Sequence, residues 1–286
     1  KKVSILSHSM STYAGVSNNT SYNSTIGKND VYYTEGRHGV YQKDTWWQQV
    51  IDLLGMKLLV NNSSGGGRIL SDEKLSVVTN GTFSSNPRNV AAYKERCVNL
   101  HNANGEDPDV ILVFLGTNDF SYHLDPDNCE ICKTLAACTV CNGTNTCKTC
   151  VTNSGLSPSF CPQDLGTADI RENLIAQNQD GTYAYLTPET TCEAYAILLH
   201  KMQQKYPDAE IYCMGLLARR DPDYAGGYHD HGQPTAFNSE MKELVERFGA
   251  TFIDLENRVP VCSAQIRAGQ QVAVVCVPRE NLKLGR

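Results

Sequence analysis

Apolar residues cluster along the chain in a pattern that predicts five strands. The runs are Lys2–Leu6, Met56–Val60, Asp109–Leu115, Glu210–Leu217 and Thr251–Leu255. The third run is continuously apolar, which is typical of a strand buried on both faces of a parallel sheet. Helical patterns occupy the intervals between the runs, so strands and helices alternate. This alternation predicts an α/β fold with a parallel sheet and right-handed crossovers.

The first predicted helix begins with Asp44 or Thr45 as its N-cap and ends at Gly55. The residues expected on its inner face are Trp46, Val50, Leu53 and Leu54. A second helix is predicted from about Asn86-Pro87 to Val98, with proline at its first position.

Two more helices are predicted in the second half of the chain. One begins with Thr187 as N-cap and Pro188 as its first residue, and it stops before Pro207. The other runs from Gln233-Pro234 to Phe248. No regular structure is predicted between Asp119 and Thr187.

Composition narrows the class of protein. The chain has 286 residues, of which 41% are hydrophobic and 20% charged, so one folded domain spanning residues 1–286 is expected, with an insertion at about 122–165. The net charge is −6 and no basic stripe is visible, which argues against a nucleic-acid partner. No run of 18 apolar residues occurs, so no membrane span is expected.

The polar cluster Ser7–Thr12 directly follows the first predicted strand. Open α/β sheets place their chemistry at the carboxyl ends of strands, which makes Ser9 the candidate nucleophile. The alternative interpretation is that Ser9, Ser11 and Thr12 only cap a turn.

Two further polar loops follow the second and third strands. They are Asn62–Arg68, which contains three consecutive glycines, and Gly116-Thr117-Asn118-Asp119. Together with Ser7-His8-Ser9, these loops resemble the conserved blocks of the SGNH (GDSL) hydrolases, a family of serine esterases and lipases. The resemblance extends to about residue 257, apart from the insertion.

This resemblance implies a three-layer α/β/α, flavodoxin-like fold with a five-stranded parallel sheet. It also implies that Ser9 is the nucleophile and that the oxyanion hole consists of the Ser9 N–H, the Gly66 N–H and the Asn118 amide. A tetrahedral intermediate needs such preorganised donors. Glycine lets the backbone approach closely, and an asparagine amide donates without carrying a charge. The resemblance implies no cofactor.

The sequence departs from the family pattern in two places. The first block normally reads Gly-Asp-Ser, whereas His8 stands before the serine here. The family also carries an Asp-x-x-His pair near its end, but no histidine follows Asp254. A divergent terminus, a truncation or an altered reading frame would each produce this ending.

The general base is therefore sought elsewhere in the chain. His8 is adjacent to Ser9 on an extended chain and should point to the opposite face. His200 is expected at a helix surface or boundary. His229 and His231 follow the fourth strand, so they lie on the side of the candidate site and are the proposed substitutes.

The insertion is rich in cysteine. Three C-x-x-C pairs begin at Cys129, Cys138 and Cys147, and Cys161 follows. We favour disulfides, because the segment has almost no apolar core of its own. A zinc site is the alternative, with the ligands Cys129, Cys132, Cys138 and Cys141, although the gaps between the pairs are short for known zinc ribbons.

The twelve cysteines and several N-x-S/T sequons favour a secreted or periplasmic location; sequons begin at Asn19, Asn23, Asn62, Asn80 and Asn142, among others. Two functions remain open at this stage. The first is a serine esterase acting on short acyl esters, such as acetyl groups on a carbohydrate, because the polar loop Thr12–Tyr41 suits a sugar. The second is a catalytically impaired relative that binds a glycan or a protein.

Overall fold

The structure is a computed structural model, and it describes most of the α/β core. The described residues are 1–17, 31, 33–35, 40–65, 67–69, 96–122, 165–186, 188–217, 220–222, 228–230 and 234–258. Several sequence-based expectations fall outside them: Gly66, His231, nearly all of the predicted second helix, and the cysteine-rich part of the insertion.

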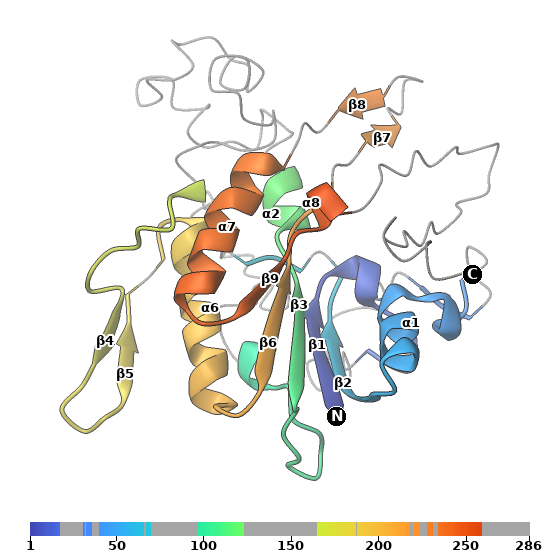
Figure 1. Cartoon of the computed structure of the whole chain (residues 1–286), viewed down its shortest axis with the longest axis horizontal. Helices are drawn as coiled ribbons and strands as arrows, with labels where there is room; N and C mark the ends of the chain where they lie inside the picture. The colour runs from blue at the N-terminus through green and yellow to red at the C-terminus, as the bar shows by residue number, and fades with distance from the viewer. Residues whose placement is uncertain are drawn as a thin grey trace, which may run out of the picture.

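Five parallel strands form the central sheet (Figure 1). They are β1 (Lys2–Ser7), β2 (Lys57–Ser63), β3 (Val110–Phe114), β6 (Glu210–Met214) and β9 (Thr251–Ile253). Their spatial order is β2-β1-β3-β6-β9, and every pairing is parallel. This is the doubly wound order of flavodoxin-like folds. The predicted fold class and all five predicted strands are confirmed.

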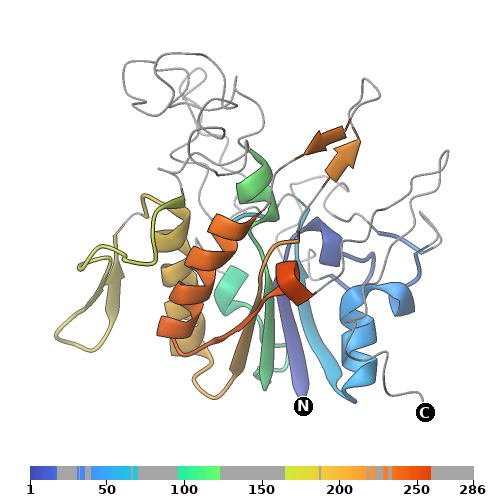
Figure 2. The same cartoon turned by 45° about the horizontal axis from the view of Figure 1, so that its top comes forward.

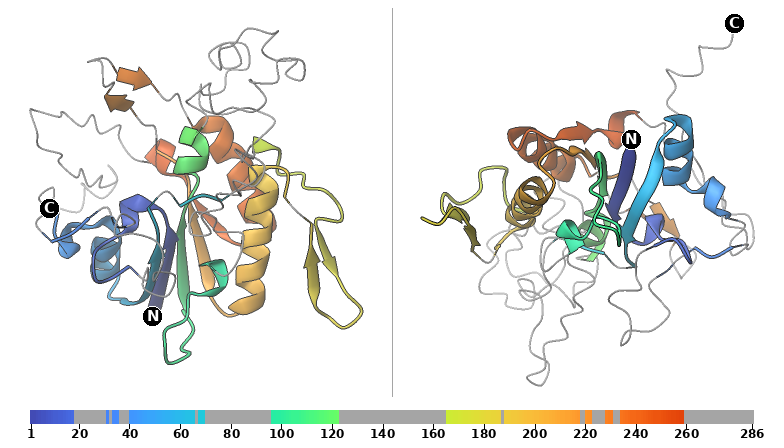
Figure 3. Two further views of the ribbon diagram at one scale, coloured as in Figure 1. Left: turned by 180° about the vertical axis from the view of Figure 1, so that it is seen from behind. Right: turned by 90° about the horizontal axis from the view of Figure 1, so that it is seen from below.

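Helices cover both faces of this sheet (Figures 1 and 3). Successive side chains of a strand point to opposite faces, so Val3 and Ile5 pack with α1 (Trp46–Leu53), whereas Leu6 packs with the opposite helices. Those opposite helices are α6 (Thr191–Lys205) and α7 (Thr235–Arg247). The result is the three-layer α/β/α arrangement, with one apolar core on each side of the sheet.

The predicted inner face of α1 is partly wrong. Thr45 is the N-cap, as expected, and its hydroxyl accepts the Gln48 N–H. However, Trp47 and Ile51 are the buried residues, whereas Leu53 is 84% exposed. A rotation of about 100° about the axis of this short helix, the angle of one residue, separates the two assignments, and only packing against the sheet selects one.

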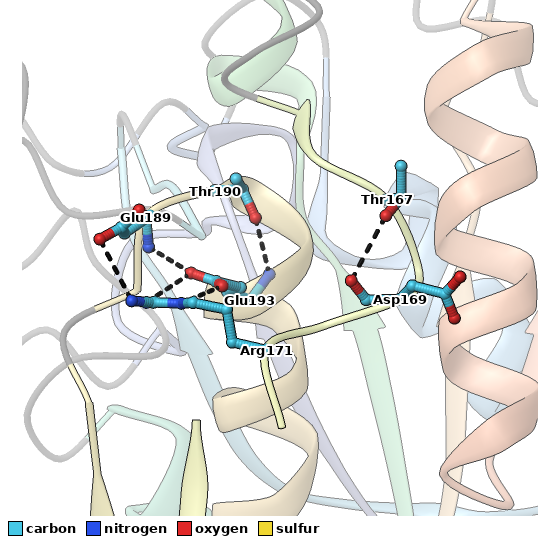
Figure 4. A network of polar contacts seen from close by, with 6 residues as sticks. All are labelled: Thr167, Asp169, Arg171, Glu189, Thr190 and Glu193. Atoms are coloured by element: carbon cyan, nitrogen blue, oxygen red, sulfur yellow. Dashed lines mark hydrogen bonds and ion pairs between the residues drawn. The ribbon is translucent and has the colours of Figure 1, made fainter. Parts of the chain in front are cut away.

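The predicted start of α6 is also wrong, because Thr190 is the N-cap in place of Thr187. The Thr190 hydroxyl accepts the Glu193 N–H, in a Thr-x-x-Glu pattern that the sequence contains. Arg171 adds a tertiary contact: its guanidinium donates to both carboxylate oxygens of Glu193, at 2.5 and 2.8 Å (Figure 4). These contacts place the helix start three residues later than predicted.

The region between Asp119 and Thr187 holds regular structure that was not predicted. Helix α2 (Thr117–Tyr122) follows β3, and strands β4 (Ile175–Gln177) and β5 (Tyr183–Tyr185) form a hairpin beside α6 (Figure 3).

A few short elements complete the described structure. They are η1 (Ser9–Ser11), η4 (Gln42–Asp44), η5 (Arg96–Val98), the β7 (Arg220–Pro222) and β8 (Tyr228–Asp230) hairpin, and α8 (Leu255–Arg258). Among the helices described, none has the length and apolar character needed to cross a membrane.

Candidate active site

The carboxyl ends of the strands carry the candidate site. Helix α2 and the β7–β8 hairpin lie at this edge (Figure 2), as does η1, which directly follows β1. Ser9 is partly exposed, and Met10 beside it is 46% exposed. Within the described part of the chain, neither the hydroxyl nor the N–H of Ser9 forms a hydrogen bond. Both groups are therefore available to a ligand.

The neighbouring hydroxyl groups hold the loop instead. The Thr12 hydroxyl donates to the Ser9 carbonyl over 2.7 Å, and Asn61 Nδ2 donates to the Ser11 carbonyl over 2.8 Å. The capping interpretation thus describes Thr12, whereas the Ser9 side chain takes no part in the turn.

A chain of buried hydrogen bonds fixes the start of this loop. Ser7 Oγ donates to the Phe114 carbonyl over 2.8 Å, so its 2.6 Å contact with Ser11 Oγ must use the Ser11 proton. Trp46 Nε1 in turn donates to Ser11 Oγ over 3.0 Å. These contacts link the loop after β1 to the end of β3 and the start of α1.

His8 is buried and spans two of the converging loops. Its Nδ1 accepts the Met10 N–H over 3.4 Å, so in the neutral ring Nε2 carries the proton and donates to Thr117 Oγ1 over 3.1 Å. The ring also packs on Phe114, with centroids 5.0 Å apart. Because both ring nitrogens already form hydrogen bonds, His8 is not placed to act as the base of Ser9. This agrees with the expectation from the sequence that His8 points away from Ser9.

Three consecutive residues of α2 hold the other loops in place. Thr117 meets His8, Asn118 Nδ2 donates to the Gly67 carbonyl over 2.8 Å, and both carboxylate oxygens of Asp119 lie 3.0 Å from the Ile69 N. The three loops quoted from the sequence therefore do converge. Asn118 Nδ2 carries a second hydrogen, and no hydrogen bond to a described residue occupies it.

Gly67 is the residue that the sequence analysis missed. A Cβ at this position would lie 3.1 Å from the Ser7 carbonyl oxygen and 3.2 Å from His8 Cα. The loop after β2 can press against the nucleophile loop only because this side chain is missing. The three consecutive glycines signalled a close approach, but they did not indicate which glycine makes it.

His200 does not complete the site. His200 Nδ1 contacts the Tyr185 hydroxyl at 3.1 Å, and its ring packs edge-on to Tyr183, so it faces the β4–β5 hairpin. Burial lowers its pKa. The prediction of a boundary histidine is confirmed. His229 lies in β8 at the candidate edge, described by its backbone alone, so its proposed role as base stays a prediction.

A surface cavity of about 550 Å³ lies a few residues beyond Ser9 along the chain. Its lining residues are Tyr13, Ala14, Gly15, Val16, Glu35, Tyr41, Gln42 and Lys43. The Tyr33 hydroxyl contacts Met10 Sδ at 3.7 Å, which connects this region to η1. The lining combines aromatic, acidic, basic and amide groups.

The described residues hold no cluster of three or more His, Cys, Asp or Glu side chains suited to a metal. The described cysteines Cys97, Cys192 and Cys213 are buried free thiols. Burial raises the pKa of Cys97 to about 11 and that of Cys213 to about 12, so these thiols are poor nucleophiles. The cysteines of the insertion, including those of the zinc alternative, lie outside the described residues.

The five-stranded order and the three loops at its carboxyl edge define an α/β protein with the SGNH-hydrolase fold. Residues 1–128 match the model of the GDSL-like Lipase/Acylhydrolase family. This match spans the three loops after the first three strands and agrees with the resemblance inferred from the sequence.

One solved structure agrees with this assignment of the fold. A protein described as a GDSL-like lipase from Bacteroides ovatus is 20% identical, with a TM-score of 0.50; the match covers 92% of this chain and 88% of that one. A second, described in the same way, from Bacteroides uniformis is 21% identical with a TM-score of 0.47, covering 92% and 86%. A search of curated proteins finds no significant match.

Proposed function

We propose that the protein is a serine esterase that hydrolyses short acyl esters, with Ser9 as the nucleophile. The observation that carries the proposal is the state of Ser9: its hydroxyl and N–H are both available in a loop whose other hydroxyls are committed to hydrogen bonds. A nucleophile needs such an uncommitted hydroxyl at the carboxyl edge of the sheet.

The proposed oxyanion hole comprises the Ser9 N–H, the Gly66 N–H and the second hydrogen of Asn118 Nδ2. The bond from Asn118 to the Gly67 carbonyl supports this role, because it fixes the amide plane before substrate arrives. Preorganised donors stabilise charge that develops in the transition state, and losing one typically costs about 100- to 1,000-fold in rate.

The chemistry is acyl transfer in two steps. The Ser9 oxygen attacks the ester carbonyl carbon while its proton passes to a base, and the alcohol leaves with that proton. Water then attacks the acyl–serine and loses a proton to the same base, which passes it to the Ser9 oxygen as the acid leaves. We assign the base to His229 or His231, because the β7–β8 hairpin stands at the edge that carries Ser9 (Figure 2).

We propose that the alcohol part of the substrate is a sugar. The cavity lined by Tyr13, Glu35, Tyr41 and Lys43 supports this class, since aromatic faces with hydrogen-bonding side chains suit a polar ring. Tyr41→Ala should then raise KM for an acetylated oligosaccharide by about tenfold, the loss of about 1.4 kcal/mol. KM for a small aryl acetate should change little.

Labelling with a fluorophosphonate tests the nucleophile. We expect the full chain to be labelled at Ser9 and Ser9→Ala to be unlabelled. Ser11→Ala is the matched control, since its hydroxyl lies in the same loop but is engaged with Ser7 and Trp46. Absence of labelling at Ser9 in the folded chain would contradict the proposal and favour the catalytically impaired, binding relative.

The rate on an aryl acetate tests the base. General-base help contributes about 100- to 10,000-fold, and neither proposed histidine occupies the family's position, so we expect slow turnover. The His229→Ala/His231→Ala double variant should lose most of what remains. A fast rate that vanishes with Ser9→Ala but survives this double change would place the base elsewhere.

A further inference from the structure

Arg96 lies directly behind the loops that carry the candidate site. It is the first residue of η5, and only 2% of its surface is exposed. Its Nη2 donates to the Ser7 carbonyl over 2.8 Å and to the Asn62 carbonyl over 2.9 Å. One guanidinium nitrogen therefore bridges the carboxyl ends of β1 and β2.

Asn62 and Arg96 are joined by reciprocal hydrogen bonds, each from a side chain to the backbone of the other residue. While the Arg96 side chain holds the Asn62 backbone, Asn62 Nδ2 donates to the Arg96 carbonyl over 3.0 Å and to the Asn99 carbonyl over 3.3 Å. Asn62 itself is 6% exposed. Hydrogen bonds from a charged donor are about twice as strong as neutral ones. The bonds from Arg96 therefore strongly constrain the positions of the ends of β1 and β2.

The Ser7 carbonyl connects Arg96 to the candidate site, because it accepts a hydrogen bond from Arg96 and lies two residues before Ser9. It also accepts the Ser64 N–H over 3.2 Å and lies against Gly67. Ser9 follows Ser7 by two residues, so the orientation of the Ser7 peptide sets where the Ser9 N–H and hydroxyl lie relative to Gly67 and Asn118.

We propose that Arg96 is a positioning residue for the Ser9 nucleophile, acting through the carbonyl groups of Ser7 and Asn62. The inference rests on the proposed esterase function. The two hydrogens of Nη2 lie in the rigid plane of the guanidinium, one for each carbonyl group, whereas a lysine ammonium at this position has rotatable donors on a flexible stem. Loss of this bridge lets the loops after β1 and β2 move independently of each other.

The test compares Arg96→Met and Arg96→Lys with Tyr206→Phe. The Tyr206 hydroxyl holds the far end of the same segment through hydrogen bonds with Val98 and Leu100, and it forms none with Ser7 or Asn62. Amide hydrogen exchange is followed in peptides covering residues 3–13 and 58–69, together with kcat and KM on an aryl acetate and the rate of fluorophosphonate labelling.

We expect Arg96→Met to raise exchange in both peptides and to lower kcat by about 10- to 100-fold with little change in KM, since a displacement of about 1 Å costs this much. Arg96→Lys should show a smaller rise in exchange and a smaller fall in kcat than Arg96→Met. Tyr206→Phe should lower the free energy of unfolding, while hydrogen exchange in the two peptides and kcat stay unchanged. If Arg96→Met does not fold, Arg96→Lys and Asn62→Ala carry the comparison, with smaller effects in the same direction.

Unchanged exchange in the two peptides, or the same fall in kcat with Tyr206→Phe, would overturn the inference. A parent chain that fluorophosphonate does not label would instead contradict the esterase proposal. In that case hydrogen exchange alone still decides whether Arg96 fixes the two loops.

Discussion

Single side chains at the candidate site each hold a separate part of the chain. Thr117, Asn118 and Asp119 are consecutive, yet they contact His8, Gly67 and Ile69 in two different loops. The preceding Gly116 has φ 108°, and a Cβ there would lie 2.4 Å from the Phe237 ring. Each position in Gly-Thr-Asn-Asp therefore has its own physical requirement.

Gly67→Ala should separate the two loops at the site. The three atoms nearest to the added methyl are backbone atoms of Ser64, Ser7 and His8, at 3.1 to 3.2 Å, and they cannot rotate away as a side chain could. We expect the rate on an aryl acetate to fall by about tenfold or more. Gly105→Ala is the control: it has φ 78° and open space around it, so it should lose stability by about 1–2 kcal/mol without a change in rate. Equal losses of rate in the two variants would contradict this expectation.

Asn62 begins an N-x-S/T sequon but is a poor glycan acceptor. Its Nδ2 is buried and donates to the Arg96 and Asn99 carbonyl groups, so an attached sugar would break both hydrogen bonds. We expect mass spectrometry of the folded protein from a secretory eukaryotic host to find Asn62 unmodified. Asn62→Gln should lower the free energy of unfolding by about 1–3 kcal/mol. A folded protein glycosylated at Asn62 would refute the assignment.

At the scale of elements, long-range contacts decide where helices begin. The first turn of α6 is held by Arg171, which lies 22 residues before Glu193 and contacts both Glu193 and Glu189 (Figure 4). Burial would raise the pKa of Glu193, but its hydrogen bonds to Arg171 and to the Glu189 N–H outweigh burial and lower it. The carboxylate form of Glu193 is therefore favoured by folding.

The lowered pKa of Glu193 makes the free energy of unfolding depend on pH. Because the folded pKa of Glu193 is below its unfolded value, the contribution is present above about pH 4.5 and is lost as the pH falls through the folded pKa. Arg171→Gln should cost about 1–3 kcal/mol of unfolding free energy near pH 7, and less near pH 3. Urea titrations at the two pH values measure the difference.

Arg247→Gln serves as the control for that experiment. Arg247 pairs with Asp169 and Glu243, whose side chains are 85% and 57% exposed, and exposed pairs contribute less than about 1 kcal/mol. A pH-independent loss in Arg171→Gln, or an equal loss in both variants, would contradict the role given to Glu193.

For the whole molecule, the cysteines divide into two groups. Cys97, Cys192 and Cys213 belong to the apolar core beside α6 and are free thiols. The remaining nine, twelve minus these three, lie in residues outside the described structure. We propose that the C-x-x-C pairs of the insertion are joined as disulfides, in keeping with a secreted or periplasmic protein.

Thiol counting separates the two groups. In the native protein, the three core thiols should be unreactive toward a soluble thiol reagent, because they are buried and their pKa values are raised. After unfolding without reductant they should react, and the total should fall well short of twelve. Nearly twelve free thiols with no bound zinc would contradict both the disulfide and the zinc interpretations.

The sequence by itself determined the alternation of strands and helices and the three polar loops that follow the first three strands. These features are local, because apolar periodicity and capping residues act over a few positions. The tertiary structure alone decided which face of α1 is buried, that α6 starts after Thr190, and that Gly67 presses on Ser7 and His8. It also brought Arg96 behind Ser7, 89 residues earlier in the chain. Such contacts depend on how the layers pack, and no local pattern encodes which distant carbonyl a side chain will reach.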